Sequence, residues 1–305
     1  MLNTVLRRLL AGFLTLWVIL TITFVLIRVL PGGPFQNPKV PESVQQALAA
    51  KYHLDAPVWV QYGAYMQGLL QGDLGPSLTA ENRRVNDLVA ESTGYSVQIG
   101  IPAMLLGSLL GVALGALAGL TRLSWLDAVL SVVGTASLAM PSFVFAGGLV
   151  LVFALGLQWL PAATVQTPGH YILPVVALSL SPFAFCFALI RNTVRENRLQ
   201  PFVRVKQAAG LPPLHIALRH VLRNSLLPLL SILGPLTAAI VTGSFAVEYI
   251  FAVPGLGKHF INAVGNRDYT VVMGITVLYS VVLIVLNLLT DLLMGWLDPR
   301  LREGR

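Results

Sequence analysis

The chain has 305 residues, of which 55% are hydrophobic and only 11% are charged, and its mean hydropathy is +0.75. A soluble domain carries about 25% charged residues, so this composition excludes an ordinary soluble protein and predicts an integral membrane protein. The net charge of +7 does not indicate nucleic-acid binding, because the basic residues are in short loops between apolar runs. The single cysteine, Cys186, excludes an internal disulfide.

Six stretches of the chain are long and apolar enough to cross a bilayer, which takes roughly 20 residues of helix. They lie at about 9–30, 97–120, 127–156, 172–190, 226–248 and 271–297. The first follows Arg7 and Arg8 but ends in Pro31-Gly32-Gly33-Pro34 rather than a cleavage site, so we interpret it as a retained anchor. Strand alternation is absent, and unpaired backbone groups are not tolerated in lipid. The sequence therefore predicts an all-α polytopic membrane protein with six transmembrane helices.

These stretches divide the chain into three parts. Residues 1–30 are an N-terminal segment with the first transmembrane helix, and residues 31–96 form an extracytoplasmic loop with short amphipathic helices at 41–54 and 58–70. Residues 97–305 form a five-helix core that includes a cytoplasmic loop, 191–225. A 66-residue loop is too long to be only a connector. We expect a small outer cap, whose role as a structural element or as a docking site stays open.

Charge asymmetry predicts the orientation of the spans. With the N-terminus inside, thirteen of the 20 Lys and Arg residues fall in cytoplasmic segments and six in outer ones, while Arg28 lies at the outer end of the first span. Short cytoplasmic loops carry this excess of positive charge. We therefore expect both termini in the cytoplasm.

Little in the spans suggests chemistry. Glu248 and Asp291 lie near span ends, where a structural hydrogen bond is the expected role, and no His, Cys, Asp and Glu cluster has metal-ligand spacing. Catalytic motifs such as G-x-S-x-G are absent. Glycines recur every four residues at 107, 111, 115 and 119, a pattern that allows two helices to pack closely.

The stretch "FVRVKQAAGLPPLHIALRHVLRNSLLP" (202–228) is basic and interrupted by prolines. We expect a helix over 202–210 with Phe202, Val205 and Ala209 on one face, ended by Gly210 in a left-handed turn. Pro212 and Pro213 prevent its continuation. The result is a short transverse helix on the cytoplasmic side, which either contacts lipid headgroups or docks a partner that supplies energy.

A second helix is expected from Leu214 into the fifth span. Its apolar stripe comprises Leu214, Leu218, Val221, Leu222 and Leu226. His215 and His220 are five residues apart, a spacing that does not place them on one face of an α-helix.

Several strings resemble a known family, the inner-membrane permease subunits of peptide-type ABC importers. They are "LRRLLAGFLTL", "RVLPGGPF", "KYHLDAPVWVQYGAYMQGLLQGDLGPS", "VNDLVAES", "PVVALSL", "KQAAGLPPLHIALRHVLRNSLLP", "GSFAVEYIFAVPGLGKHFINAVGNRDY" and "LDPRLR". They extend over essentially the whole chain. The "PGGPF" and "VNDLVAES" strings favour the oligopeptide branch over the dipeptide branch.

The resemblance implies a type I ABC importer permease fold in a bacterial cytoplasmic (inner) membrane, with a coupling helix that enters a cleft on an ATPase subunit. The implied ATPase-coupling residues are Phe202, Arg204, Val205, Lys206, Gln207, Ala208, Ala209, Gly210, Leu211 and His215. Arg204 departs from the family pattern, since a glutamate is usual there. The implied partners are a second homologous permease, two cytoplasmic ATP-binding subunits and an extracytoplasmic peptide-binding protein. ATP and Mg²⁺ would bind to the ATPases, and no cofactor is expected in this chain.

The translocation path is expected at polar or small residues of kinked spans. The candidates are Ser137, Ser142, Thr237, Thr242 and Ser244, although helix packing explains the same residues equally well. Two alternatives to an importer permease are a secondary transporter, which would need intramembrane ligands for a coupling ion, and a membrane-embedded enzyme, which would need a catalytic cluster.

Overall fold

A computed structural model of the chain describes residues 2–29, 32–35 and 41–297, and every regular element in that part is a helix. The structure divides into two compact units, residues 1–95 with 254–284 and residues 96–253 with 285–305. The helices α4 (Val85–Leu120) and α14 (Tyr269–Leu297) contribute to both. Pro31, Lys39, Arg300, Arg302 and Arg305, which entered the sequence predictions, lie outside the described residues.

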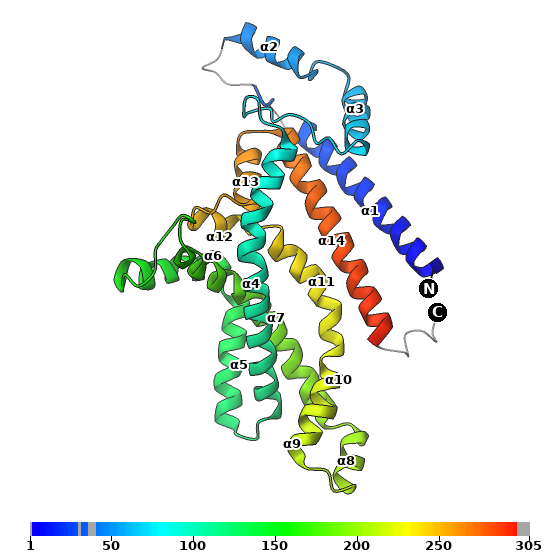
Figure 1. Ribbon diagram of the computed structural model, residues 1–305, viewed down its shortest axis with the longest axis vertical. Helices are drawn as coiled ribbons and strands as arrows, with labels where there is room; N and C mark the ends of the chain where they lie inside the picture. The colour runs from blue at the N-terminus through cyan, green and yellow to red at the C-terminus, as the bar shows by residue number, and fades with distance from the viewer. Residues whose placement is uncertain (1, 30–31, 36–40, 298–305) are drawn as a thin grey trace. The chain divides into compact units, whose positions relative to one another are not determined.

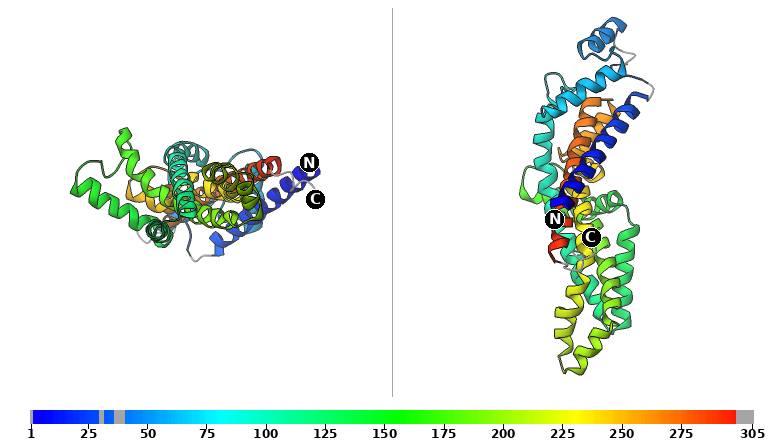
Figure 2. Two further views of the ribbon diagram at one scale, coloured as in Figure 1. Left: turned by 90° about the horizontal axis from the view of Figure 1, so that it is seen from below. Right: turned by 90° about the vertical axis from the view of Figure 1, so that its right-hand side faces the viewer.

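The first unit contains the N-terminal helix and the segments predicted to be extracytoplasmic. Its helices are α1 (Leu2–Val29), α2 (Glu42–Lys51), α3 (Val58–Leu70), α13 (Leu256–Gly265) and the first parts of α4 and α14. In Figures 1 and 2, α1 and the first half of α14 lie side by side. Leu20 and Phe24 of α1 pack with Met273 of α14 and with Tyr62 and Tyr65 of α3. The expected outer helices at 41–54 and 58–70 are therefore confirmed as α2 and α3.

The second unit contains most of the transmembrane core. Its helices are α5 (Ser124–Ala139), α6 (Ser142–Leu149), the π-helix η1 (Val150–Gly156), the 3₁₀ helix η2 (Pro168–Tyr171), α7 (Ile172–Arg198), α8 (Pro201–Ala208), α9 (Pro213–Ile216), the π-helix η3 (Ala217–Leu222), α10 (Arg223–Ser225), α11 (Leu227–Val241), α12 (Phe245–Ile250) and the remainder of α4 and α14. Here α5 packs along α7, and α6 packs against both α7 and α12.

Five helical segments of the described residues are long and apolar enough to span a membrane. They are Leu6–Val29, Val85–Leu120, Pro168–Arg198, Leu227–Ile250 and Tyr269–Gly295. The predicted span 127–156 is not one straight helix, because α5 and the α6–η1 segment meet at an angle of 107°. Pro141 lacks a backbone N–H and holds Met140 in an extended conformation (φ −84°, ψ 118°), which ends α5. The number of spans is six when this bent pair counts as one.

The glycine pattern of α4 is explained by its contact with α7. An added Cβ on Gly111 would lie 2.6 Å from the Phe183 carbonyl oxygen and 2.7 Å from Cys186 Cβ, and one on Gly115 would lie 2.7 Å from the Phe187 carbonyl oxygen. These neighbours are mainly backbone atoms, so the helices approach as closely as their main chains allow. The predicted close packing is confirmed, and Cys186 is buried in it.

The cytoplasm-assigned ends of α4, α5 and α7 are joined by polar contacts. Asp127 of α5 accepts hydrogen bonds from Arg191 Nε at 3.0 Å and Arg195 Nη2 at 2.5 Å. Arg198 Nη1 donates to the Gly119 carbonyl oxygen at 2.7 Å. Three of the basic residues that predicted the orientation, Arg191, Arg195 and Arg198, thus also stabilise this helix end.

Asp268 joins the loop before α4 to the start of α14. Its carboxylate accepts hydrogen bonds from the Ser77 hydroxyl, the Thr79 hydroxyl (2.9 Å) and the Leu78 amide (3.2 Å). It also accepts one from the Val271 amide (3.2 Å), the N-cap contact of α14. Only 1% of the residue is exposed. Burial alone would raise the pKa of Asp268, but these donors outweigh burial, and its pKa lies below the ordinary value.

We expect replacement of Asp268 by alanine to destabilise the first unit by about 2 kcal/mol or more, since buried hydrogen bonds to a charged group are each worth about 1.5–3 kcal/mol. Because the folded-state pKa is lowered, the carboxylate's contribution is fully present above its unfolded pKa of about 4 and is lost as the pH falls through the lower folded value. Thermal unfolding of Asp268→Ala and Asp268→Asn against pH measures this. Asp55→Asn, at an exposed turn position of the same unit, is the matched control and should unfold like the native chain.

Candidate functional site

The short helix α8 occupies the position predicted for the transverse helix (Figure 1), and a turn at Gly210 follows its last residue, Ala208, and the C-cap Ala209. Gly210 has φ +76°, its amide donates to the Gln207 carbonyl oxygen at 3.0 Å, and the Leu211 amide donates to the Lys206 carbonyl oxygen at 3.2 Å. This pair of bonds is a Schellman motif. The predicted left-handed end is confirmed, and α9 restarts the helical chain at Pro213.

Apolar side chains fix α8 to the helix ends behind it. Val203 is buried and belongs to one apolar cluster with Ile190 and Val194 of α7, Ile216 of α9 and Val221 of η3. Phe202 of the predicted apolar face also packs against this cluster, whereas Val205 of the same face is 65% exposed. In an eight-residue helix the spacing of apolar residues is compatible with more than one buried face. The fold shows that Val203 is on the buried face. Val205 is free for a partner.

The ten predicted coupling residues share one exposed segment. Arg204, Val205, Gln207, Ala208, Ala209 and Gly210 are exposed, and Phe202, Lys206, Leu211 and His215 are half-buried. Of the second predicted stripe, Val221 is buried and Leu222 and Leu226 pack against the cluster. Leu214 and Leu218, by contrast, are exposed. The exposed apolar residues of this end, Val205, Leu214 and Leu218, are those a docking surface would use.

His215 and His220 lie together, contrary to the expectation from their spacing. Their rings are 5.8 Å apart in an edge-on arrangement. The physical reason is the π-helix η3, whose wider turn places residues five apart on one face. The pKa of His220 lies below its ordinary value through desolvation and the neighbouring basic side chains Lys206, His215 and Arg219.

The predicted path residues flank two breaks in the helices of the second unit. Ser137 and Ser142 stand on either side of the α5–α6 bend. Thr237, Thr242 and Ser244 surround the end of α11, where Gly243 has φ +101°. The Thr242 hydroxyl is buried and donates to the Ala238 carbonyl oxygen at 2.6 Å, and the Ser137 hydroxyl donates to the Val133 carbonyl oxygen at 2.8 Å. These two hydroxyls are thus occupied within their own helices.

The two breaks are close neighbours, since α6 and α12 pack against each other. Glu248 of α12 is fully buried, and its Oε1 accepts a hydrogen bond from the Ser96 hydroxyl of α4 at 2.8 Å. The structural role expected for Glu248 is confirmed. Discontinuous helices near one another at membrane depth are a feature of transport pathways, because freed backbone groups there line a cavity rather than lipid.

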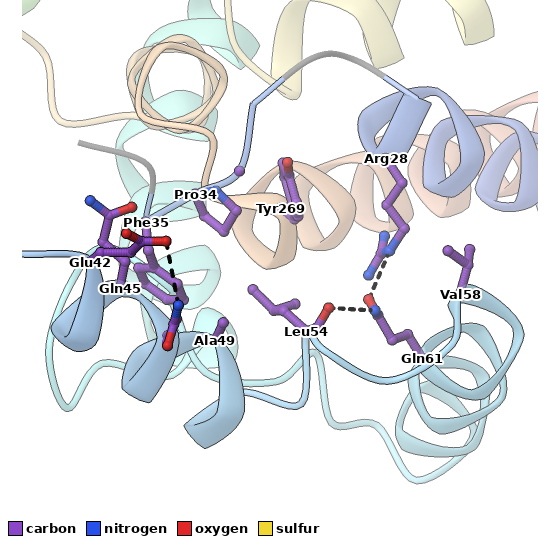
Figure 3. A pocket seen from close by; sticks show the side chains of 12 residues that line it. Arg28, Pro34, Phe35, Glu42, Gln45, Ala49, Leu54, Val58, Gln61 and Tyr269 are labelled. Carbon is purple, nitrogen blue, oxygen red and sulfur yellow. Dashed lines mark hydrogen bonds between the residues drawn. The ribbon is translucent and has the colours of Figure 1, made fainter. Parts of the chain in front are cut away.

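The outer cap holds a pocket of about 460 Å³ within the first unit (Figure 3). Arg28 closes one side: its guanidinium carbon lies 3.4 Å from the Phe24 ring centroid, and its Nε donates to Gln61 Oε1 at 3.0 Å. Gln61 Nε2 in turn donates to the Leu54 and Ala56 carbonyl oxygens at 3.1 and 2.8 Å. Arg28 therefore fixes the turn between α2 and α3 instead of only extending toward the surface.

In the part of the chain that the structure describes, no group of three His, Cys, Asp or Glu side chains could hold a metal ion. What the geometry offers is mechanical: the short helix α8 is anchored through Val203 at one end of the second unit, and the helices of its core are interrupted at Met140–Pro141 and at Gly243.

The family model described as "Binding-protein-dependent transport system inner membrane component" matches residues 111–303, and its N-terminal counterpart matches residues 1–81. The chain belongs to this family. A permease named for dipeptide transport from Bacillus subtilis is 41% identical over 94% of each chain. Permeases named for oligopeptide transport from Haemophilus influenzae and Escherichia coli K12 are 38% and 39% identical over 99% of this chain and all of theirs.

Solved structures support the fold of a type I ABC permease. A methionine ABC transporter in inward-facing conformations has a TM-score of 0.53, and an amino acid ABC transporter crystallised with histidines has 0.54. Each is 18% identical and covers 69% of this chain and 94% of the other. The chain is thus a multi-pass permease of an ABC transporter family, and a secondary transporter is excluded. Members of this family are pore-forming subunits.

Proposed function

We propose that this chain forms half of the translocation pore of an ATP-driven importer that moves oligopeptides or dipeptides across the bacterial cytoplasmic membrane. The observation that carries the mechanism is α8, whose buried Val203 ties an exposed segment rigidly to the ends of α4 and α7. A displacement of this segment by a partner is transmitted to the transmembrane core as a rigid-body movement. The names of the relatives, permeases of dipeptide and oligopeptide transport, support peptides as the substrate.

The proposed complex contains a second homologous permease, two cytoplasmic ATPase subunits and an extracytoplasmic peptide-binding protein. ATP and Mg²⁺ bind to the ATPases, and this chain supplies no catalytic residue. Residues 202–215 face the cytoplasm, as does each terminus. Closure of the ATPases on ATP moves α8, the bend at Pro141 and the break at Gly243 let the core helices change their angles, and the pore opens to the peptide delivered from outside.

Uptake by cells that lack other peptide importers tests this proposal. Cells that express the complete transporter should accumulate labelled peptides from a mixed-length library only with this chain, the binding protein and ATP. Accumulation should persist when a protonophore collapses the proton gradient while ATP is maintained. Uptake that needs the proton gradient and continues with inactive ATPases contradicts the proposal. The lengths of the accumulated peptides separate oligopeptide from dipeptide transport.

A further inference from the structure

A second pocket, of about 760 Å³, lies within the second unit between the coupling segment, residues 202–215, and the ends of α4 and α7. Its lining residues come from the ends of α4 and α7, from α8, and from α9 and η3. Three arginines line it, Arg122, Arg195 and Arg198, and none of its twelve lining residues is acidic. This combination marks a site for an anion.

The arginines retain donors for such a ligand. Arg122 is exposed and makes no hydrogen bond or ion pair among the described residues. Arg198 uses one Nη1 N–H on the Gly119 carbonyl oxygen, and Arg195 uses Nη2 on Asp127. A guanidinium has five N–H donors, so most remain available, and their planar arrangement matches the oxygens of a phosphate.

Apart from Gln207, the rest of the lining is apolar, and a soluble phosphate would make no use of an apolar wall. Leu120, Leu199 and Val203 contribute to the wall, and the adjoining Leu123 and Trp125 at the start of α5 are exposed. An exposed tryptophan beside apolar residues is typical of the membrane interface. A ligand that satisfies both the arginines and this wall has a phosphate next to acyl chains.

We propose that this pocket binds the headgroup of an anionic phospholipid of the inner leaflet. Basic pockets between transmembrane helices on the cytoplasmic side bind such headgroups. The proposal rests on the orientation under the proposed function, in which this end faces the cytoplasm. Because α8 and α9 form one wall of the pocket, a bound lipid braces the coupling segment against α4 and α7. The lipid composition of the membrane then affects coupling.

The test is native mass spectrometry of the transporter, purified with the subunits it retains and titrated with phosphatidylglycerol or phosphatidylcholine. Arg122→Gln should weaken phosphatidylglycerol binding about fivefold, the effect of one basic residue near an anionic surface, and leave phosphatidylcholine binding unchanged. Arg122→Lys should retain most of the binding. The matched control is Arg223→Gln, which removes an equal charge from an exposed residue of the same end that does not line the pocket.

Several results would overturn the proposal. Native affinity in Arg122→Gln, or an equal loss in Arg223→Gln, would show that the pocket is not the site. Displacement of the lipid by inorganic phosphate or by deacylated glycerophosphoglycerol would assign the pocket to a soluble anion. Displacement on adding the ATPase subunits would assign it to an acidic partner surface. Retention of the ATPases by each variant is recorded separately, so that a failure of the proposed function can be distinguished from a failure of the lipid proposal. Unchanged melting temperatures of the variants exclude misfolding.

Discussion

Replacement of Gly111 by leucine should abolish a folded, monodisperse chain. The position faces α7 so closely that even a Cβ would lie 2.6 Å from the Phe183 carbonyl oxygen and 3.0 Å from the Phe187 nitrogen. Backbone atoms cannot rotate out of the way, so α4 and α7 would have to separate. Separation removes the apolar contact of residues along the whole stripe, because the helices are rigid. Forced overpacking costs about 1–3 kcal/mol for small additions, and a leucine exceeds what the interface tolerates.

Fluorescence-detected size-exclusion chromatography of the solubilised chain measures the effect. Gly111→Ala should give a monodisperse peak with a lowered melting temperature, and Gly111→Leu should give aggregate. The matched control is Gly94→Ala on the same helix, since an added Cβ at Gly94 meets nothing within 4 Å. A Gly111→Leu chain that elutes and melts like Gly94→Ala would show that α4 and α7 do not pack through the glycine stripe.

The glycine stripe was predictable because a four-residue repeat of small residues has one geometric use in a helix. The bend at Met140–Pro141 was not: hydropathy measures the apolar length of 127–156, which both a straight and a broken helix satisfy. Pro141 was visible in the sequence, but so were Pro102 and Pro182, which lie inside continuous helices. Whether a proline bends a helix depends on which neighbouring groups satisfy the freed backbone carbonyls. A single sequence does not show which groups become neighbours in the fold.

The coupling segment shows the same division between local and tertiary information. Gly210 followed by two prolines encodes a helix end by local sterics alone, and the structure has that end. The burial of Val203 depends instead on where the end of α7 lies, and a single sequence does not specify that position. The contact of His215 with His220 depends on the π-helical turn of 217–222. The prediction from their spacing took this segment to be an α-helix, in which residues five apart lie on different faces. Local rules therefore give the element, and packing decides which of its side chains remain available to a partner.

Replacement of residues 204–210 by a flexible Gly-Ser linker should abolish ATPase binding and peptide uptake while the permease itself remains folded. The anchors Val203 and Ile216 stay in place, but the exposed surface of α8 and its rigid connection are lost. Loss of one central anchor of an interface costs about 2 kcal/mol or more, roughly a 30-fold weakening of binding. Co-purification of the ATPases with the tagged chain and uptake in cells measure the two effects. Normal ATPase retention and uptake would show that residues 204–210 do not couple.

A matched pair at Gly210 separates the rigidity of the segment from its contacts. An added Cβ at Gly210 meets nothing within 4 Å, yet the residue has φ +76°, so a substitution there changes conformational preference and not packing. Valine disfavours the left-handed region by roughly 1–2 kcal/mol, whereas asparagine tolerates it. Gly210→Val should reduce peptide uptake more than ATPase retention, because α8 still presents its side chains but no longer ends in a fixed turn. Gly210→Asn should retain nearly native uptake and ATPase retention. Equal uptake by the two variants would mean that force reaches the core without the Schellman turn.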